Sequence, residues 1–419
     1  MPTPPGRAVR GELVALLLVL AALTVVFWAT PLDLAAADAF REPCCSWPMA
    51  DRPLWRFLYR YGVLAGVLLA AGALVTFTLS YWYPGKLHAW RRPALFLVVV
   101  AAIGPGLVVN VLFKDHYGRP RPREVTALGG QERFLPVWVK GSDPQAKSFP
   151  CGHCAMGFYL ATPYLLLRKR RRRAAVAVLA GGIAYGGLMG AARMMAGGHF
   201  LSDVVWSAGM TWLVALAAYP LLGLHREPAP VPAARDRGKA RLATALGGGL
   251  LAILTVGVLL ATPYLSSKTF SRSAAQVATS AASIWEVSLD RATVSVEAGP
   301  GFEASYDVQA FGFPTSKMGF AFREEGGAAV LTIEPVGWFT ERRTQVKLVL
   351  PRDGEKPVRL RLGQGRVALD LRSFAPSARL DVEVGEGTVR VIGAAGPDGE
   401  RVRVHVGKGD VVRDGAPAR

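Results

Sequence analysis

The sequence contains no zinc finger or other nucleic-acid-binding motif, and it is short of acidic residues. Its 31 Asp and Glu are outnumbered by 49 Lys and Arg, so the formal net charge is +18 over 419 residues. The basic residues cluster in short loops between long apolar runs, which is typical of membrane proteins rather than of nucleic-acid-binding proteins. We therefore expect a membrane protein with no nucleic-acid partner.

The apolar runs predict several transmembrane helices, each of which needs about 20 apolar residues to cross a bilayer. No small-residue cleavage site clearly follows the first run, so we interpret it as a retained helix rather than a signal peptide. The fourth run is short and is expected to extend by a few residues at each end. The seven predicted spans lie near residues 11–30, 62–83, 94–113, 155–167, 174–192, 203–224 and 243–265.

The basic clusters orient these spans, because Lys and Arg are enriched in cytoplasmic loops. All four clusters fall on one side if every run spans the membrane. They are Arg7 with Arg10, Lys86 with Arg91 and Arg92, the run 168–173, and Arg235 with Arg237, Lys239 and Arg241. The loops 31–61, 114–154 and 193–202 and everything after residue 265 then lie on the outer side. We expect a multi-pass protein of a bacterial inner membrane with these loops in the periplasm.

The residues after the last span have a different pattern. Apolar and polar residues alternate in 358–362, 380–384 and 402–406, as in half-buried strands. A Gly-x-Gly sequence follows each strand, and the spacing is 22 residues both times, which predicts stacked β-coils or a repeated hairpin sandwich. No helix follows these glycines, so we interpret them as turn residues and not as a nucleotide-binding loop.

Three polar segments at the ends of predicted spans carry the residues suited to catalysis. The first runs from Lys114 to Pro122, the second from Phe149 to His153, and the third from Arg193 to Asp203. Cations brought together from separate segments repel one another unless an anion lies between them, and Arg can bind a phosphate with two parallel hydrogen bonds.

The histidines of these segments suit a reaction at that phosphate. His199 precedes Asp203 by four residues, so a carboxylate can fix the imidazole tautomer and leave the other nitrogen as a nucleophile. His153, at the expected start of a helix, can protonate a leaving oxygen.

These segments resemble the type 2 phosphatidic acid phosphatase superfamily. Its pattern is Lys-x6-Arg-Pro, then Pro-Ser-Gly-His, then Ser-Arg-x5-His-x3-Asp. The matching residues are Lys114, Arg121, Pro122, Pro150, Gly152, His153, Arg193, His199 and Asp203. Cys151 and Ala192 stand where the superfamily has Ser, so two hydroxyl donors are missing. The resemblance covers roughly residues 30–225.

The resemblance implies a metal-independent phosphatase that uses no cofactor. His199 would attack phosphorus and form a phosphohistidine, Asp203 would orient it, and His153 would be the acid. Lys114, Arg121 and Arg193 would bind the phosphate, together with backbone groups at Cys151 and Gly152. Apart from the resemblance, the position of Arg119 and Arg123 near the predicted membrane surface makes them candidates to line a headgroup pocket.

The sequences at 125–136 and 197–203, and the first outer loop with Asp33 and 55–61, resemble the lipid A phosphatase branch. Lipid A is therefore the implied substrate, with undecaprenyl diphosphate and phosphatidylglycerol phosphate as alternatives. A lipid phosphotransferase, a vanadate-dependent haloperoxidase and an inactive envelope scaffold are the other functions considered.

The four cysteines, Cys44, Cys45, Cys151 and Cys154, all lie on the predicted outer side, where disulfides persist. We expect one or two disulfides that join the first outer loop to the second segment. Free thiols and a zinc site are the alternatives.

The expected organisation is an all-α polytopic membrane bundle followed by an all-β extracytoplasmic repeat domain. Residues 1–225 form a phosphatase core of six helices, 226–242 a cytoplasmic linker, 243–265 a seventh transmembrane helix, and 285–415 the β domain, for which an envelope partner is possible. The sequence does not predict an oligomeric state.

Overall fold

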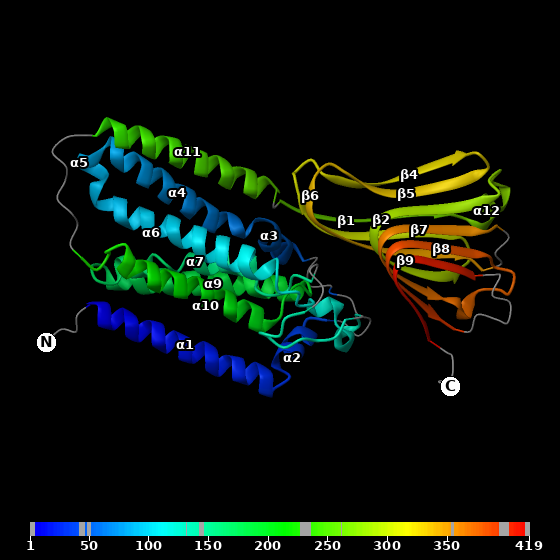
Figure 1. Cartoon of the computed structure of the whole chain (residues 1–419), viewed down its shortest axis with the longest axis horizontal. Helices are drawn as coiled ribbons and strands as arrows, with labels where there is room; N and C mark the ends of the chain where they lie inside the picture. The colour runs from blue at the N-terminus through cyan, green and yellow to red at the C-terminus, as the bar shows by residue number, and fades with distance from the viewer. Residues whose placement is uncertain are drawn as a thin grey trace. The chain divides into compact units, whose positions relative to one another are not determined.

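The computed structural model describes residues 5–41, 47, 52–130, 132–141, 146–226, 236–260, 262–352, 356–393 and 402–414. The chain divides into two compact units, Met1–Ile253 and Leu254–Arg419. The first unit is helical and the second is built around one sheet (Figure 1).

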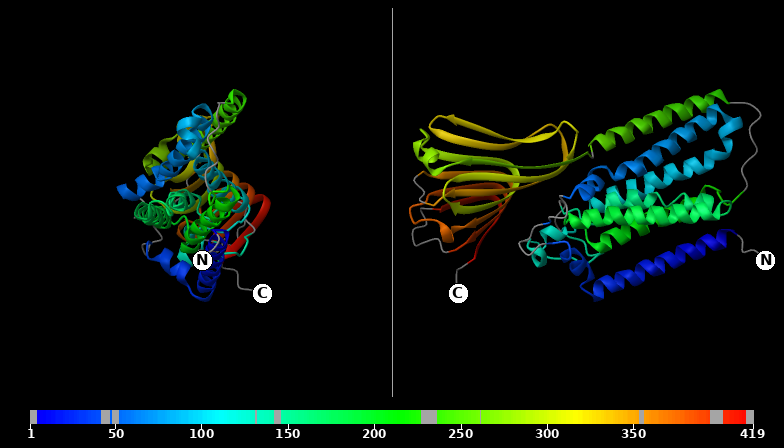
Figure 2. Two further views of the ribbon diagram at one scale, coloured as in Figure 1. Left: turned by 90° about the vertical axis from the view of Figure 1, so that its left-hand side faces the viewer. Right: turned by 180° about the vertical axis from the view of Figure 1, so that it is seen from behind.

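The first unit is a bundle of helices that run side by side, as two further views also show (Figure 2). Within the described residues, six continuous helical segments are long and apolar enough to cross a membrane, which confirms the predicted polytopic fold. Their outward side chains are apolar; Leu18 on the first helix, for example, is 65% exposed, as expected of a surface that faces lipid. The helices are α1 (Pro5–Ala29), α3 with α4 (Pro53–Tyr61 and Val63–Trp82), α5, η2, α6 and η3 in series (Pro84–Leu87, His88–Trp90, Arg91–Ala101 and Ala102–Lys114), α9 (Arg172–Met195), α10 (Leu201–Leu221) and α11 (Arg237–Leu260).

The fourth predicted span differs from a continuous helix. It forms α7 (Gly152–Tyr159) and α8 (Tyr164–Leu167), which are joined by tighter turns with hydrogen bonds to the third preceding residue. Pro163 lies at this break, and a proline has no amide hydrogen and its ring clashes with the preceding turn. The segment still packs inside the bundle, where α7 contacts α9, α10, η3 and α4.

Glycines allow α7 and α9 to approach each other closely. A Cβ on Gly157 would lie 2.8 Å from the Cα of Gly186, and one on Gly182 would lie 2.3 Å from the amide nitrogen of Ala161. Small residues at helix contacts serve the same purpose in membrane proteins generally. The N-terminus of α7, which carries His153, is therefore held against the ends of its neighbours.

Ion pairs tie both ends of α1 to the bundle. At one end the Glu12 carboxylate accepts a hydrogen bond of 2.6 Å from Arg168, the first residue of the RKRRRR sequence. At the other end the chain continues into the short helix α2 (Leu32–Asp38), whose Asp33 is buried beside the start of α10. The basic loop of residues 168–171 and the loop between α9 and α10 consequently lie at opposite ends of the helices (Figure 1).

The described residues of the second unit form nine strands in one sheet, in the order β1-β3-β6-β2-β7-β8-β9, with the hairpin β4–β5 paired to β2 through β5. Strands β2, β7, β8 and β9 are parallel, and partners on β7, β8 and β9 are 22 residues apart, as for Val358, Leu380 and Val402. The spacing seen in the sequence is thus the register of stacked coils, whereas hairpins would require antiparallel neighbours. The strands are β1 (Thr262–Arg272), β2 (Ile284–Gly299), β3 (Phe302–Gly312), β4 (Lys317–Glu325), β5 (Ala328–Val336), β6 (Phe339–Pro351), β7 (Val358–Asp370), β8 (Leu380–Ile392) and β9 (Val402–Asp414).

The β region begins before residue 285, because β1 pairs with β3 along its whole length. Its sequence is rich in Ser and Thr, which hides the alternation seen in later strands. The Gly-x-Gly residues lie inside the strands, where the coils bend. Gly387 has φ of 149°, and a Cβ there would lie 1.7 Å from the carbonyl oxygen of Gly365 on the coil below. Only glycine fits this close stacking.

Candidate active site

The three polar segments meet at one end of the helices of the first unit (Figure 1). The first begins at the end of η3 and leads into the short turns η4 (Pro122–Glu124) and η5 (Thr126–Leu128). The second leads into α7, and the third joins α9 to α10. Lys114, Arg121 and Arg193 are all close enough to His199 to act on its charge. The predicted convergence of these segments is therefore present in the structure.

His199 presents one ring nitrogen to this cationic site. The side chain is 1% exposed, and its Nδ1 lies 2.5 Å from the carbonyl oxygen of Ser148. A carbonyl can only accept, so Nδ1 carries the hydrogen and Nε2 has a lone pair. Nε2 is buried and has no hydrogen-bond partner among the described residues. The imidazole is thus oriented as a nucleophile requires.

Burial and positive charge lower the pKa of the His199 imidazole well below its ordinary value of 6.5. Desolvation is the largest cause, followed by the charges of Arg193, Arg121 and Lys114, while the hydrogen bond to Ser148 acts in the opposite direction. Each of the three cations disfavours a second positive charge nearby. His199 is consequently neutral at neutral pH, which is the form with an available lone pair.

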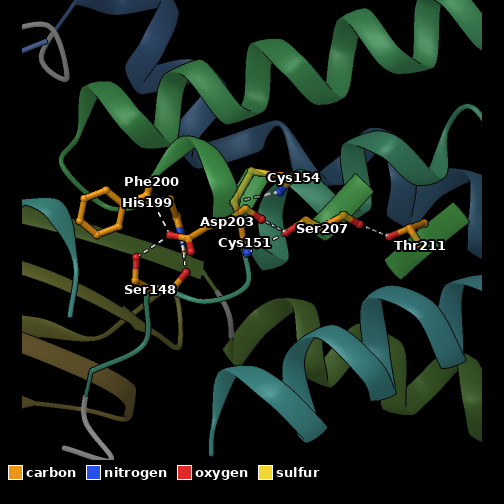
Figure 3. Close-up of a disulfide and its surroundings, with 8 residues drawn as sticks. All are labelled: Ser148, Cys151, Cys154, His199, Phe200, Asp203, Ser207 and Thr211. Atoms are coloured by element: carbon orange, nitrogen blue, oxygen red, sulfur yellow. Dashed lines mark hydrogen bonds and ion pairs between the residues drawn. A yellow bond between two sulfur atoms is a disulfide. The ribbon is translucent and has the colours of Figure 1, made fainter. Parts of the chain in front are cut away.

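Asp203 supports His199 through Ser148 rather than by a direct bond (Figure 3). Its Oδ2 accepts from the Ser148 hydroxyl at 2.6 Å and from the Phe200 amide at 2.8 Å, and lies 3.7 Å from His199 Nδ1. Ser148 therefore holds the carboxylate with its side chain and the imidazole with its carbonyl. The sequence motifs do not include Ser148, because its role depends on a contact with residues about 50 positions later.

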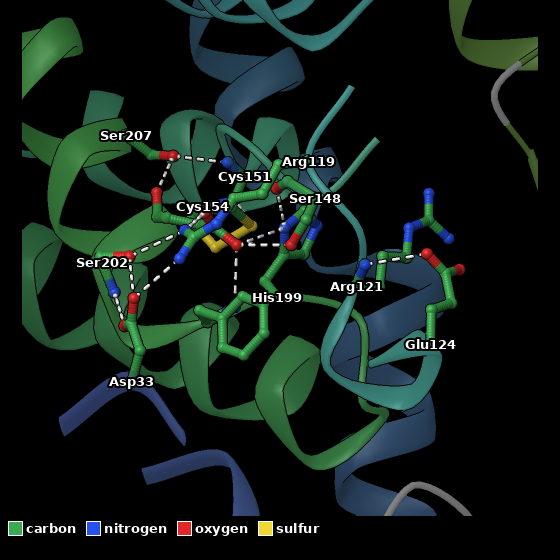
Figure 4. A network of polar contacts seen from close by, with 12 residues as sticks. Asp33, Arg119, Arg121, Glu124, Ser148, Cys151, Cys154, His199, Ser202 and Ser207 are labelled. Atoms are coloured by element: carbon green, nitrogen blue, oxygen red, sulfur yellow. Dashed lines mark hydrogen bonds and ion pairs between the residues drawn. A yellow bond between two sulfur atoms is a disulfide. The ribbon is translucent and has the colours of Figure 1, made fainter. Parts of the chain in front are cut away.

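Arg119 lies beneath this network and does not line a headgroup pocket (Figure 4). Its side chain is fully buried between Asp33, whose carboxylate it meets at 2.8 Å, and Asp203. It also donates to the Ser202 hydroxyl and the Leu135 carbonyl, both at 2.9 Å. The expected role at the headgroup is wrong for Arg119, because its guanidinium is fully buried and is bound to protein groups.

Arg193 and His153 share Tyr59 as a neighbour. The guanidinium of Arg193 lies 4.2 Å from the centre of the Tyr59 ring, and the ring of His153 is stacked on the same tyrosine with 6.0 Å between centroids. Arg193 is 2% exposed, and within the described part of the chain its Nε and Nη1 have no hydrogen-bond partner. Two buried donors without a partner are costly unless a ligand accepts from them, and a phosphate has the geometry to do so.

The second segment departs from the expectation at Cys151. Its sulfur is bonded to Cys154, and its amide donates to the Ser207 hydroxyl at 2.7 Å (Figure 3). The sulfur therefore has no hydrogen to donate and the amide is already occupied, so we leave Cys151 out of the phosphate-binding set. Gly152 begins α7 beside Asn110, where a Cβ would lie 2.4 Å from the amide oxygen.

The observed disulfide also replaces the expected one between the first outer loop and the second segment. Cys151 and Cys154 are bonded to each other, so neither can pair with Cys44 or Cys45, which lie outside the described residues. In the described ranges no group of three or more His, Cys, Asp or Glu side chains is placed to hold a metal ion.

Comparison with known proteins agrees with the geometry. A family model described as the PAP2 superfamily matches residues 92–226. The lipid A 4'-phosphatase of Francisella tularensis subsp. novicida is 40% identical over 158 residues, which are 37% of this chain and 69% of that protein. The chain belongs to the PAP2 superfamily. The predictions of a phosphatase family and of a polytopic membrane fold are both confirmed.

Other relatives match smaller shares. The lipid A 4'-phosphatase of Rhizobium leguminosarum is 37% identical over 121 residues. The matched residues are 29% of this chain and 49% of that protein, so the chain spans about half of it. A solved PAP2-type phosphatidylglycerolphosphate phosphatase from Bacillus subtilis is 19% identical, with a TM-score of 0.32. The superposed residues are 50% of this chain and 94% of the Bacillus subtilis chain.

Replacing Ser148 by Ala tests the link between Asp203 and His199. The variant keeps the carbonyl that holds Nδ1 but leaves Asp203 without one of its donors, and a hydrogen bond to a charged group contributes about 1.5–3 kcal/mol. We expect kcat to fall by roughly tenfold or more, with little change in KM. Thr162→Ala is the matched control, since among the described residues this buried hydroxyl bonds only to the Tyr159 carbonyl. Equal effects of the two substitutions would contradict the role of Ser148.

The cations should set the acid side of the pH profile. Replacing Lys114 by Met removes one positive charge that lowers the pKa of His199, so that pKa rises. A larger fraction of His199 is then protonated at acidic pH, and the acid limb of kcat/KM moves to higher pH. Lys114→Arg keeps the charge and should leave the limb in place. All three proteins are assayed with one substrate, so the titration of its phosphate affects each profile equally. An acid limb of Lys114→Met that coincides with that of the wild type would contradict an effect of the Lys114 charge on His199.

Proposed function

We propose that the protein removes a phosphate from lipid A through a phosphohistidine at His199. The observation that carries the proposal is the buried Nε2 of His199 near Nε and Nη1 of Arg193, since none of these three atoms has a hydrogen-bond partner among the described residues. A phosphate placed there would accept from Arg193 and present phosphorus to Nε2. The choice of lipid A rests on the relatives named lipid A 4'-phosphatase.

The reaction would proceed in two displacements. His199 Nε2 forms a bond to phosphorus as the ester P–O bond breaks, and His153 gives a proton to the departing lipid oxygen. The imidazole then carries a positive charge, which the Ser148 carbonyl and the nearby Asp203 stabilise. Water next attacks phosphorus while His153 accepts its proton, the N–P bond breaks, and inorganic phosphate leaves.

Lys114, Arg121 and Arg193 would balance the charge of the bound phosphate in both steps. Their positive charges oppose protonation of His199 before the substrate arrives, and they favour the negative charge that gathers on the phosphoryl oxygens during transfer. We assign them to phosphate binding, with the α7 N-terminus at Gly152 as a further source of amide donors.

We also propose that the site faces the periplasm of a bacterial inner membrane. The support is the clustering of Lys and Arg in the loops at the opposite end of the helices, as in residues 168–173. Alternation of the spans would put the residues after 260 on the same side of the membrane as the catalytic loops. An envelope partner for these residues fits that location.

Phosphate release by the purified protein in detergent tests the activity. The substrates to compare are lipid A, undecaprenyl diphosphate, phosphatidylglycerol phosphate and phosphatidate. Each is assayed with and without a second lipid as acceptor, since phosphate transfer to that lipid would indicate a phosphotransferase. We expect release from lipid A and its loss, by at least about a thousandfold, in His199→Asn. Undiminished release by that variant would contradict the proposal.

The His153 step has a sharper test. An aryl phosphate such as p-nitrophenyl phosphate has a good leaving group and needs no acid for the first displacement. His153→Asn should therefore still form the phosphoenzyme from the aryl phosphate. Hydrolysis of the phosphoenzyme should be slow in this variant, so that an acid-labile, alkali-stable phosphoprotein accumulates. Wild type should show little of this species, and its absence from both proteins would contradict a covalent intermediate.

A further inference from the structure

An exposed apolar tip marks one end of the second unit. Phe313 lies between β3 and β4, and Val336 and Trp338 lie at the link from β5 to β6. The side chains are 42%, 62% and 78% exposed, respectively. The two links are joined by the Phe313 amide, which donates to the Trp338 carbonyl at 2.9 Å. Exposed aromatic residues gathered at one tip of a sheet require an explanation.

The tip is adjacent to the end of the last transmembrane helix. Leu254–Leu260, the final part of α11, belong to the same unit as the sheet. The carbonyl of Leu260 accepts from the hydroxyl of Thr340 on β6 at 3.1 Å, and the same hydroxyl lies 3.2 Å from the Phe311 carbonyl on β3. The helix end is thus bonded directly to the strand that follows Trp338.

The register of the sheet gives the same placement independently. Thr262, the first residue of β1, is opposite Gly312 of β3, and Gly312 is opposite Phe339 of β6. Neighbouring strands lie about 4.8 Å apart, so Phe339, two strands away, lies roughly 10 Å from the start of β1. Phe313 and Trp338 directly follow and precede these two residues.

The length of the span shows where the hydrocarbon ends. Residues 242–260 form an uncharged stretch of 19 residues after Arg241. At 1.5 Å per residue this is about 28 Å, close to the roughly 30 Å thickness of the hydrocarbon core. This length would put Leu260 near the boundary of the hydrocarbon core, so a tip at the level of Leu260 would lie among the headgroups, where Trp side chains are enriched.

We propose that Phe313, Val336 and Trp338 insert into the headgroup region of the bilayer and fix the β unit against the membrane surface. Lys317, which is exposed at the start of β4 and paired in register with Val336, would lie beside anionic headgroups. The hydrogen bond from Thr340 to the Leu260 carbonyl would keep the tip close to the end of the span. The partner of this surface is the lipid bilayer, and the proposal does not depend on the phosphatase activity.

Spin labels in the full-length protein test this contact. Cys44 and Cys45 are first replaced by Ser, and a nitroxide is attached to Trp338→Cys or to Glu325→Cys. Glu325 is the matched control, because it is exposed at the other end of the β4–β5 hairpin. The side chain of Trp338 is mostly exposed and its hydrogen bonds are made by its backbone carbonyl, so the substitution should leave the fold intact.

The labelled proteins are placed in mixed phosphatidylethanolamine and phosphatidylglycerol vesicles, and the label's accessibility to oxygen and to a water-soluble nickel complex is measured. We expect a several-fold higher ratio of oxygen to nickel accessibility at 338 than at 325. Equal ratios of the aqueous type at both positions would overturn the proposal. A label at 338 that is shielded from both reagents would also overturn it, because that result indicates a protein neighbour in place of lipid.

Discussion

The site depends on one buried positive charge. Arg119 is fully enclosed between Asp33 on α2 and Asp203 on α10, and removing one partner of such a pair leaves an uncompensated charge, at a cost of about 3–5 kcal/mol. The need to keep Arg119 paired with both carboxylates fixes α2 against the start of α10. Asp203 is thereby held where the hydroxyl of Ser148 can reach it, and the carbonyl of Ser148 in turn holds His199.

The arrangement separates two kinds of cation. Arg119 is neutralised by carboxylates and works as a fixed part of the fold. Arg193 has two buried donors with no partner in the part of the chain that the structure describes, and its guanidinium lies over the Tyr59 ring, which also stacks on His153. A site of this kind is complementary to an anion that arrives with the substrate. The same positive field keeps His199 neutral until then, so that binding and nucleophilicity have a common electrostatic cause.

Much of this could be predicted from the sequence, because the signals are local. Six spans follow from continuous apolar runs, and the 22-residue spacing is the register of β7, β8 and β9. The break at Pro163, the roles of Ser148 and Arg119, and the pairing of Cys151 with Cys154 were not predicted. Each depends on which distant groups meet in three dimensions. Arg119, for instance, was expected at a headgroup pocket from its place in the first segment, and only its burial against Asp33 identifies it as structural.

The Ser148 carbonyl holds His199 as a neutral imidazole with its hydrogen on Nδ1. Nitrogen-15 NMR of the histidine-labelled protein tests this tautomer, with the His199 signals assigned by their loss in His199→Asn. At neutral pH we expect a protonated Nδ1 and an unprotonated Nε2 for this residue. An imidazolium, or a hydrogen on Nε2, would contradict it, since neither form presents a lone pair to phosphorus at that nitrogen.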